Sequence, residues 1–161
     1  MKRKRSLIGL SIAVGLMVAL PASVAEGYGE RIQGVPVMQG GVIAGDRIVY
    51  EGAGVVVVPS VAEAFDSCPS GWVCLFSNII WGGAMFQISS CCGWVNLADY
   101  GFNESASSWR NRKNVDAQIA MNANGGGTKL CLNNGSYSST MPTGWDNTAS
   151  SIRVRDASTY C

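Results

Sequence analysis

An internal repeat constrains this chain more than any other feature. Residues 73–88, VCLFSNIIWGGAMFQI, align without a gap with residues 117–132, AQIAMNANGGGTKLCL. Apolar positions alternate in both copies, as half-buried strands require, and each copy contains a Gly-rich turn. Two such units can bury their apolar faces against each other. The repeat therefore predicts an all-β domain, built as a small β-sandwich of two supersecondary units.

The repeat continues into a second pair of similar stretches. Residues 101–111, GFNESASSWRN, correspond to residues 144–154, GWDNTASSIRV, so that one Ser-Ser pair lies over the other. We predict a domain over residues 68–161, with repeats over 68–112 and 113–156.

The first residues indicate export. Four basic residues begin the chain, a run of fourteen mostly apolar residues follows, and PASVA supplies small residues for cleavage. The run is shorter than the roughly 20 residues that span a bilayer. We predict a signal peptide over residues 1–25 and a secreted mature chain that begins at Glu26 and has no membrane association. Its eight basic and eleven acidic residues give a formal net charge of −3, which argues against a nucleic-acid partner.

The cysteines predict disulfide bonds, because the count is even and the chain is exported. They are Cys68, Cys74, Cys91, Cys92, Cys131 and Cys161. Fifteen pairings are open, with Cys68–Cys74 a local candidate across a Pro-Ser-Gly turn. Vicinal Cys91 and Cys92 are expected to bond different partners, since their Cβ vectors diverge in an extended chain.

The sequence has no His, which removes Ser/His and Cys/His nucleophile pairs and predicts that the chain is not an enzyme.

Residues 26–67 differ in sequence pattern from the repeats. Two β-branched runs flank Glu51-Gly52-Ala53-Gly54, which predicts a β-hairpin. This N-terminal extension is either an extension of the sheet or a removable pro-region, and the sequence leaves both open.

The motif FSNIIWGG resembles the Greek-key signature of the βγ-crystallins. Phe76, Trp81 and Gly83 occupy its two aromatic positions and its glycine. The resemblance implies a βγ-crystallin-like double Greek-key β-sandwich, here with an N-terminal β-hairpin extension. It also implies that the aromatic residues pack at a folded hairpin and that Gly83 adopts a conformation that side chains disfavour. Ala120 and Gly125 replace the aromatic residues in the second repeat, so its hairpin is expected to be less firmly held.

The resemblance also implies weak calcium binding. The family's signature is two Asn/Asp residues, two spacers, Ser/Thr and Ser. DNTASS fits it throughout, and NESASS departs from it only at Glu104. The implied ligands come from both repeats: Asn103, Glu104, Ser105, Ser107, Asp146, Asn147, Thr148 and Ser150. With few carboxylates, the expected Kd is about 10⁻⁵ to 10⁻³ M. The alternative is that these side chains only hydrogen-bond the loop backbone.

A closer resemblance covers most of the mature chain. CPSGWVCLFSNIIWGG, CGWVNLADYGFNESASSWRN, ANGGGTKLCL and DNTASSIRV together resemble the secreted actinobacterial peptidase inhibitors typified by the Streptomyces-type metalloproteinase inhibitor. This implies a monomer that binds an extracellular protease, such as a metalloprotease, tightly and without catalysis. The resemblance does not identify the inhibitory loop. Residues 133–145 are a candidate because they form a polar, Gly-containing connection, with Tyr137 and Met141 as its apolar anchors. The alternative is that they form an ordinary loop between strands. The alternative function is that of an extracellular calcium-binding module that inhibits nothing.

Overall fold

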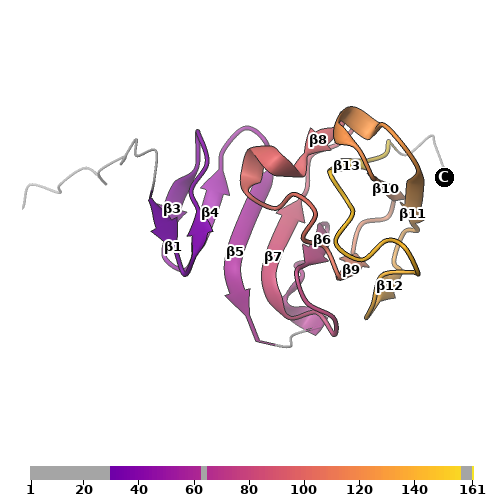
Figure 1. Ribbon diagram of the computed structural model, residues 1–161. Coiled ribbons are helices and arrows are strands. Elements are labelled where there is room, and N and C mark those ends of the chain that lie inside the picture. Colours follow the sequence, from indigo (N-terminus) through magenta and orange to yellow (C-terminus); the bar gives the residue numbers. More distant parts are fainter. Residues whose placement is uncertain (1–29, 63–64, 157–160) are drawn as a thin grey trace, which may run out of the picture.

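The computed structural model describes residues 30–62, 65–156 and 161 (Figure 1). The predicted signal peptide and Glu26 lie outside these residues. The described residues form thirteen β-strands and three short 3-10 helices, with no α-helix among them. None of their helices has the length and hydropathy that a membrane span needs. The prediction of an all-β fold is confirmed.

Eight strands belong to the two repeats. The first repeat contributes β6 (Val73–Phe76), β7 (Gly83–Ile88), β8 (Val95–Asn96) and β9 (Ser108–Asn111). The second contributes β10 (Ala117–Ala120), β11 (Lys129–Leu132), β12 (Tyr137–Ser138) and β13 (Ser151–Val154). The 3-10 helices are η1 (Phe65–Ser67), η2 (Leu97–Tyr100) and η3 (Ala123–Gly125).

The repeats have the same strand register and exchange one strand each. Val73 pairs with Ile88 between β6 and β7, and Ala117 pairs with Leu132 between β10 and β11, at the offset that the sequence repeat predicts. Strand β8 pairs with β13 of the second repeat, while β12 pairs with β9 of the first. The result is a four-stranded sheet, β11-β10-β13-β8, and a seven-stranded sheet, β12-β9-β6-β7-β5-β4-β3. This is the predicted double Greek key.

Alternation along the strands divides the buried side chains between two clusters. The larger cluster includes Leu75 and Phe86 from the seven-stranded sheet and Ile119 and Ile152 from the four-stranded sheet. Cys74 and Phe76 flank Leu75 in β6 and belong to a smaller cluster with Val58, Cys68 and Met85. Since neighbouring side chains of a strand point to opposite faces, β6 is buried on both faces.

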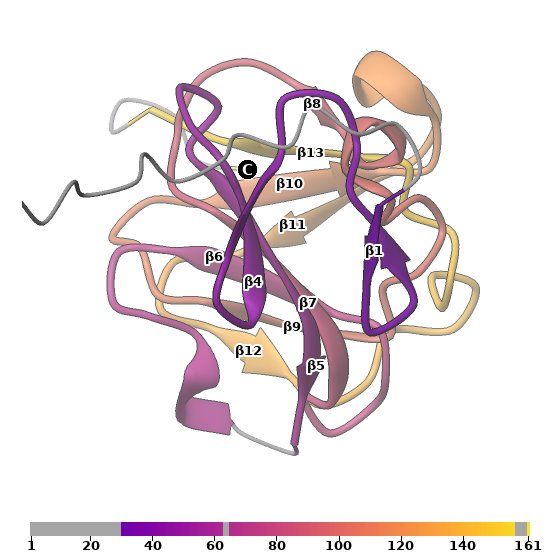
Figure 2. The ribbon, with the colours of Figure 1, turned by 90° about the vertical axis from the view of Figure 1, so that its left-hand side faces the viewer.

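The N-terminal extension is part of the larger sheet. It contains β1 (Arg31–Ile32), β2 (Val35–Pro36), β3 (Val42–Ala44), β4 (Arg47–Tyr50) and β5 (Val55–Val61). Tyr50 pairs with Val55 across Glu51–Gly54, so the predicted hairpin is confirmed. Figure 2 shows β5 beside β7, and Val55 of β5 pairs with Ile88 of β7. Strand β4 lies on the other side of β5. In this structure the hairpin is therefore a sheet extension.

Three disulfide bonds use all six cysteines. Cys68–Cys74 forms as the local candidate predicted, and Cys131 bonds Cys161. The expectation that Cys91 and Cys92 have different partners is wrong, because they bond each other. That expectation assumed an extended chain. The backbone instead bends here, and a positive φ of 88° at Cys92 changes the direction of its side chain.

Candidate functional site

The two Ser-Ser loops lie against each other and exchange backbone hydrogen bonds. The N–H of Glu104 donates to the carbonyl of Ala149 at 2.9 Å, and the N–H of Asn147 donates to that of Ala106 at 3.0 Å. Glu104 and Asn147 also share a left-handed backbone, with φ of 51° and 54°. These matched contacts relate the loops by an approximate twofold symmetry. Loops some forty residues apart in sequence thus form one surface.

One hydrogen bond joins side chains of the two loops. The Ser107 hydroxyl donates to Oδ1 of Asn147 at 3.3 Å. Ser107 and its counterpart Ser150 are both buried, whereas Asn147 and its counterpart Glu104 are exposed. The amide oxygen of exposed Asn147 in the second loop therefore lies beside the buried Ser107 hydroxyl of the first loop.

The remaining candidate ligands lie around this contact. Asn103 and Asp146 are exposed, while Ser105 and Thr148 are half-buried. Ser105 donates to the carbonyl of Asn103 at 2.9 Å, and Thr148 donates to the carbonyl of Trp145 at 3.0 Å. For these two hydroxyls, the structure shows the loop-bracing hydrogen bonds that were the alternative to calcium ligation.

The donor set of the paired loops fits a hard cation. It consists of amide, hydroxyl, carboxylate and backbone carbonyl oxygens, which are the ligands that calcium takes. Glu104 and Asp146 are the two carboxylates among the candidate ligands. Among the described residues, one cluster of metal-ligating types combines Asp116 with Cys131 and Cys161. Those two sulfurs form a disulfide, so they are not thiolate ligands.

The second serine of each pair has a structural role that the sequence did not reveal. The Ser108 hydroxyl donates to the carbonyl of Asn78 at 2.7 Å and accepts the N–H of Trp81 at 3.1 Å. Ser151 makes the same two bonds in the second repeat, at 2.7 Å to the carbonyl of Asn122 and 3.0 Å from the N–H of Gly125. Both serines are fully buried. In the sequence, the only sign of this role was that a serine recurs at the equivalent position of each repeat.

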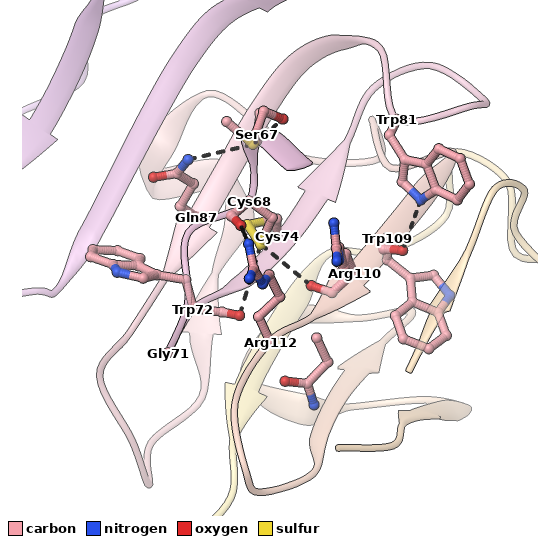
Figure 3. The surroundings of a disulfide bond; sticks show 12 residues. Ser67, Cys68, Gly71, Trp72, Cys74, Trp81, Gln87, Trp109, Arg110 and Arg112 are labelled. Atoms are coloured by element: carbon pink, nitrogen blue, oxygen red, sulfur yellow. Dashed lines mark hydrogen bonds between the residues drawn. A yellow bond between two sulfur atoms is a disulfide. The ribbon is translucent and has the colours of Figure 1, made fainter. Parts of the chain in front are cut away.

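The folded hairpin of the first repeat is built around Trp81. Its indole N–H donates to the carbonyl of Trp109 at 3.3 Å, near the Cys68–Cys74 disulfide (Figure 3). Gly83 has a φ of 77°, and a Cβ there would collide with Ser77. These features agree with the roles that the resemblance implied.

The hairpin of the second repeat is held differently. The Trp94 ring lies against Gly125, so closely that a Cβ on Gly125 would overlap it. Trp94 belongs to the first repeat, and it packs where the second repeat lacks its own aromatic residue. Together with Ser151, this contact supports a hairpin that the sequence predicted to be less firmly held.

A basic cluster between the repeats braces neighbouring loops. Arg112 donates to the carbonyl of Cys68 at 2.8 Å (Figure 3). Lys113 donates through Nζ to the carbonyls of Ser89 at 2.8 Å and Gly71 at 3.1 Å. Burial lowers the pKa of the Lys113 ammonium group. The partners are backbone carbonyls, which any residue could supply, so the sequence carries no signal for this bracing role.

Exposed apolar side chains gather beside the folded hairpin of the first repeat. Ile79, Ile80 and Tyr137 are 54%, 45% and 56% exposed. The Ile80 N–H donates to the carbonyl of Ser139 at 2.8 Å, which ties the hairpin to the segment after β12. The Tyr137 ring packs edge-on against Phe65, at 4.8 Å between centroids, and lies 6.0 Å from Trp81. We call Phe65, Ile79, Ile80, Trp81 and Tyr137 the apolar surface.

The predicted contact loop is only partly consistent with this surface. Tyr137 is exposed, as an anchor must be, but Met141 is 8% exposed and packs in the main core. Its backbone N–H bonds the carbonyl of Ser107, which holds it beneath the paired loops. Met141 is therefore not an anchor, and Ile79 and Ile80 are the exposed apolar residues that the prediction missed.

Comparisons with known proteins bear on this site. No curated protein is significantly similar to the chain in sequence. Residues 61–120 match the model of peptidase inhibitor family I36. The predicted resemblance to this family of peptidase inhibitors is thereby confirmed. I36 is a family of peptidase inhibitors, which agrees with the expectation that the chain is not an enzyme.

Solved structures of βγ-crystallin domains are similar to this chain. One, concerned with the evolution of the eye lens βγ-crystallin domain fold, is matched over 62% of this chain and 95% of its own, at 22% identity and a TM-score of 0.51. Another is a βγ-crystallin domain from Flavobacterium johnsoniae, matched over 55% of this chain and 98% of its own, at 27% identity and a TM-score of 0.45. The first likeness confirms the βγ-crystallin-like fold.

Proposed function

We propose that the mature chain is a secreted inhibitor that binds an extracellular protease tightly, as a monomer and without catalysis. The match to family I36 over residues 61–120 is the observation that carries this proposal. A metalloprotease is the favoured partner, in line with the resemblance that the sequence motifs carry. The disulfide bonds are those expected of a protein that works outside the cell.

The apolar surface is the proposed contact with the protease. Four of its five residues lie in the matched segment, and Tyr137 lies outside it. Several hydrogen bonds fix its backbone, including those of Ile80 with Ser139 and Trp81 with Ser108. A loop ordered before binding loses little conformational entropy on association.

The chemistry of the surface also suits an interface. The Arg110 guanidinium lies over the Phe65 ring, 3.5 Å from its centroid, and bonds Asp66 at 2.9 Å. Aromatic residues and arginine are enriched at the energetic centres of interfaces. Since Arg110 and Asp66 offset each other in charge, the surface suits uncharged, apolar subsites of a protease.

A panel of purified metalloproteases and serine proteases tests the proposal. We expect stoichiometric inhibition of at least one protease by the mature protein. The double variant Ile79→Ser/Ile80→Ser should inhibit that protease about 100-fold less tightly, since each truncated anchor costs about 1–2 kcal/mol. Val42→Ser is the matched control, because Val42 is 41% exposed and lies at the opposite edge of the seven-stranded sheet. Equal loss in the control would remove the apolar surface from the proposal, and no inhibition across the panel would refute the function.

Weak calcium binding by the paired loops is the second part of the proposal. Its support is the matched exchange of hydrogen bonds that brings Ser107 and Asn147 together. At a tenfold excess over Kd, calcium should raise the free energy of unfolding by about 1.4 kcal/mol. Calorimetry and thermal unfolding check this. Calcium-dependent stabilisation without inhibition would instead favour a non-inhibitory calcium-binding module.

The N-terminal extension is proposed to remain in the mature protein. Its β5 strand is hydrogen-bonded to β7, and its residues Ile48 and Val57 are fully buried in the main core. Removal would expose to water both the edge of β7 and the part of the main core that Ile48 and Val57 cover. Intact-mass measurement of the secreted protein is the direct check, with a start at Glu26 as the expected result.

A further inference from the structure

The Cys91–Cys92 disulfide differs from the other two bridges in its position. Both residues are exposed, in the connection between β7 and β8. Cys68 and Cys74, by contrast, are fully buried. The Cys131–Cys161 bridge joins positions 30 residues apart, whereas Cys91 and Cys92 are adjacent. A disulfide stabilises mainly by closing a loop of the unfolded chain, and a bond between neighbours closes almost none.

Other contacts already hold the segment around this bridge. The N–H of Cys92 donates to the carbonyl of Val154 at 3.0 Å, and the N–H of Ser89 donates to that of Gly54 at 2.9 Å. The Ser90 hydroxyl bonds the carbonyl of Ala53 at 2.7 Å, and Lys113 bonds the carbonyl of Ser89. The path of the chain therefore does not depend on the sulfur–sulfur bond.

Cys92 lies at a hollow that is lined mainly by charged residues. Cys92 lines a shallow hollow together with Arg153, Val154, Arg155 and Asp156. The Arg153 guanidinium is held over the Trp94 ring, 4.8 Å from its centroid, and bonds Gln118 through two nitrogens. Two guanidinium groups and one carboxylate give this hollow a net positive charge. Positive neighbours stabilise a cysteine thiolate and so make it a better leaving group.

We propose that Cys91–Cys92 is a covalent modification site for small thiols. A thiolate attacks Sγ of Cys91 and forms a mixed disulfide, while the Cys91–Cys92 bond breaks. Cys92 leaves as a thiolate at the hollow that Arg153 also lines, and it takes a proton from solvent. A second thiol that attacks the mixed disulfide releases the small disulfide and leaves both cysteines as thiols. Two small thiols are then oxidised, and the protein bridge is reduced by two electrons.

Reduced glutathione is the probe for this site. The native mature protein is incubated with increasing glutathione, free thiols are trapped by alkylation, and peptides are mapped by mass spectrometry. Modification of Cys91 and Cys92 should require about tenfold less glutathione than modification of the other four cysteines, because accessible disulfides exchange first. Glutathione should be found mainly on Cys91 and the alkyl label on Cys92, with an unchanged near-UV circular dichroism spectrum. Simultaneous opening of all three bridges, or earlier opening of Cys131–Cys161, would overturn the proposal.

A pair of variants separates a reactive site from a structural bridge. Cys91→Ser/Cys92→Ser should keep the Tm of the unmodified protein and take up no glutathione under the same conditions. Cys131→Ser/Cys161→Ser should lower the Tm yet still be modified at Cys91. If the first variant loses as much Tm as the second, Cys91–Cys92 is a structural bridge and the proposal fails. Neither readout depends on protease inhibition.

Discussion

At the scale of single residues, the two serines of each Ser-Ser pair differ in role. Ser151→Ala should lower the free energy of unfolding by about 1–3 kcal/mol, because a buried N–H and a buried carbonyl lose their partner. Ser150→Ala should cost less than that, because the two hydrogen bonds to the hairpin are made by Ser151, while Ser150 is a candidate calcium ligand. Urea unfolding of both variants checks the contrast. Equal losses of unfolding free energy would mean that Ser150 and Ser151 do not differ in structural role.

Calcium affinity should depend on the carboxylate at position 104. Glu104 departs from the calcium signature, and it is one of two carboxylates among the candidate ligands. Glu104→Gln should weaken calcium binding by about three- to tenfold, because affinity follows the charge count of the ligands. Titration calorimetry measures this, with Glu51→Gln as a control on an exposed turn. Unchanged affinity would exclude Glu104 as a ligand.

Residue identity alone predicted some of these details and not others. The Cys68–Cys74 bridge could be predicted because a Pro-Ser-Gly turn brings its ends together. The Cys91–Cys92 bridge could not, since it depends on a positive φ at a residue that rarely adopts one. The burial of Met141 could not be predicted either, because an isolated apolar residue in a polar loop belongs to no periodic hydrophobic pattern.

At the scale of elements, the N-terminal extension docks through Tyr50. Its ring packs edge-on against Tyr100 at 4.7 Å, and its hydroxyl accepts the N–H of Met38 at 3.3 Å. Burial raises the pKa of Tyr50, with a smaller contribution from Tyr100. A raised pKa in the folded state stabilises the fold below the unfolded value of 10.0, and this contribution is lost as pH rises through the folded pKa.

A phenylalanine at position 50 tests this contact. Above about pH 10 the unmodified protein should lose stability more steeply than Tyr50→Phe, because the phenylalanine variant has no hydroxyl at position 50 to ionise. Urea unfolding across that range is the measurement. Tyr100, whose pKa burial also raises, remains in both proteins and sets the common background. Parallel pH profiles would contradict the account.

Strand pairing was predictable where the strands are long enough to show a pattern. The alternation in residues 73–88 and 117–132 predicted half-buried strands, and the ungapped repeat predicted that β6 with β7 and β10 with β11 pair alike. The exchanged strands β8 and β12 have two residues each. Two residues carry no period, so the exchange that closes the double Greek key could not be derived from alternation and entered only through the βγ-crystallin resemblance.

At the scale of the whole molecule, the Cys131–Cys161 bridge ties the C-terminal residue to the second repeat. It spans 30 residues, and Cys161 also donates its N–H to Asp116 at 2.9 Å. Cys131→Ser/Cys161→Ser should lower the free energy of unfolding by about 3–4 kcal/mol on the loop-entropy relation. Urea unfolding of the double variant gives the value. A loss below about 1 kcal/mol would mean that the bridge contributes little to the stability of the folded protein.

The inhibition assay tests the central claim most directly. Purified mature protein is titrated against a metalloprotease and serine protease panel, beside Ile79→Ser/Ile80→Ser and Val42→Ser, at high and low calcium. We expect stoichiometric inhibition of at least one protease by the unmodified protein and by Val42→Ser, and a loss of about 100-fold in affinity for the double variant. Complete absence of inhibition, with all three proteins folded, would contradict the proposed inhibitor function.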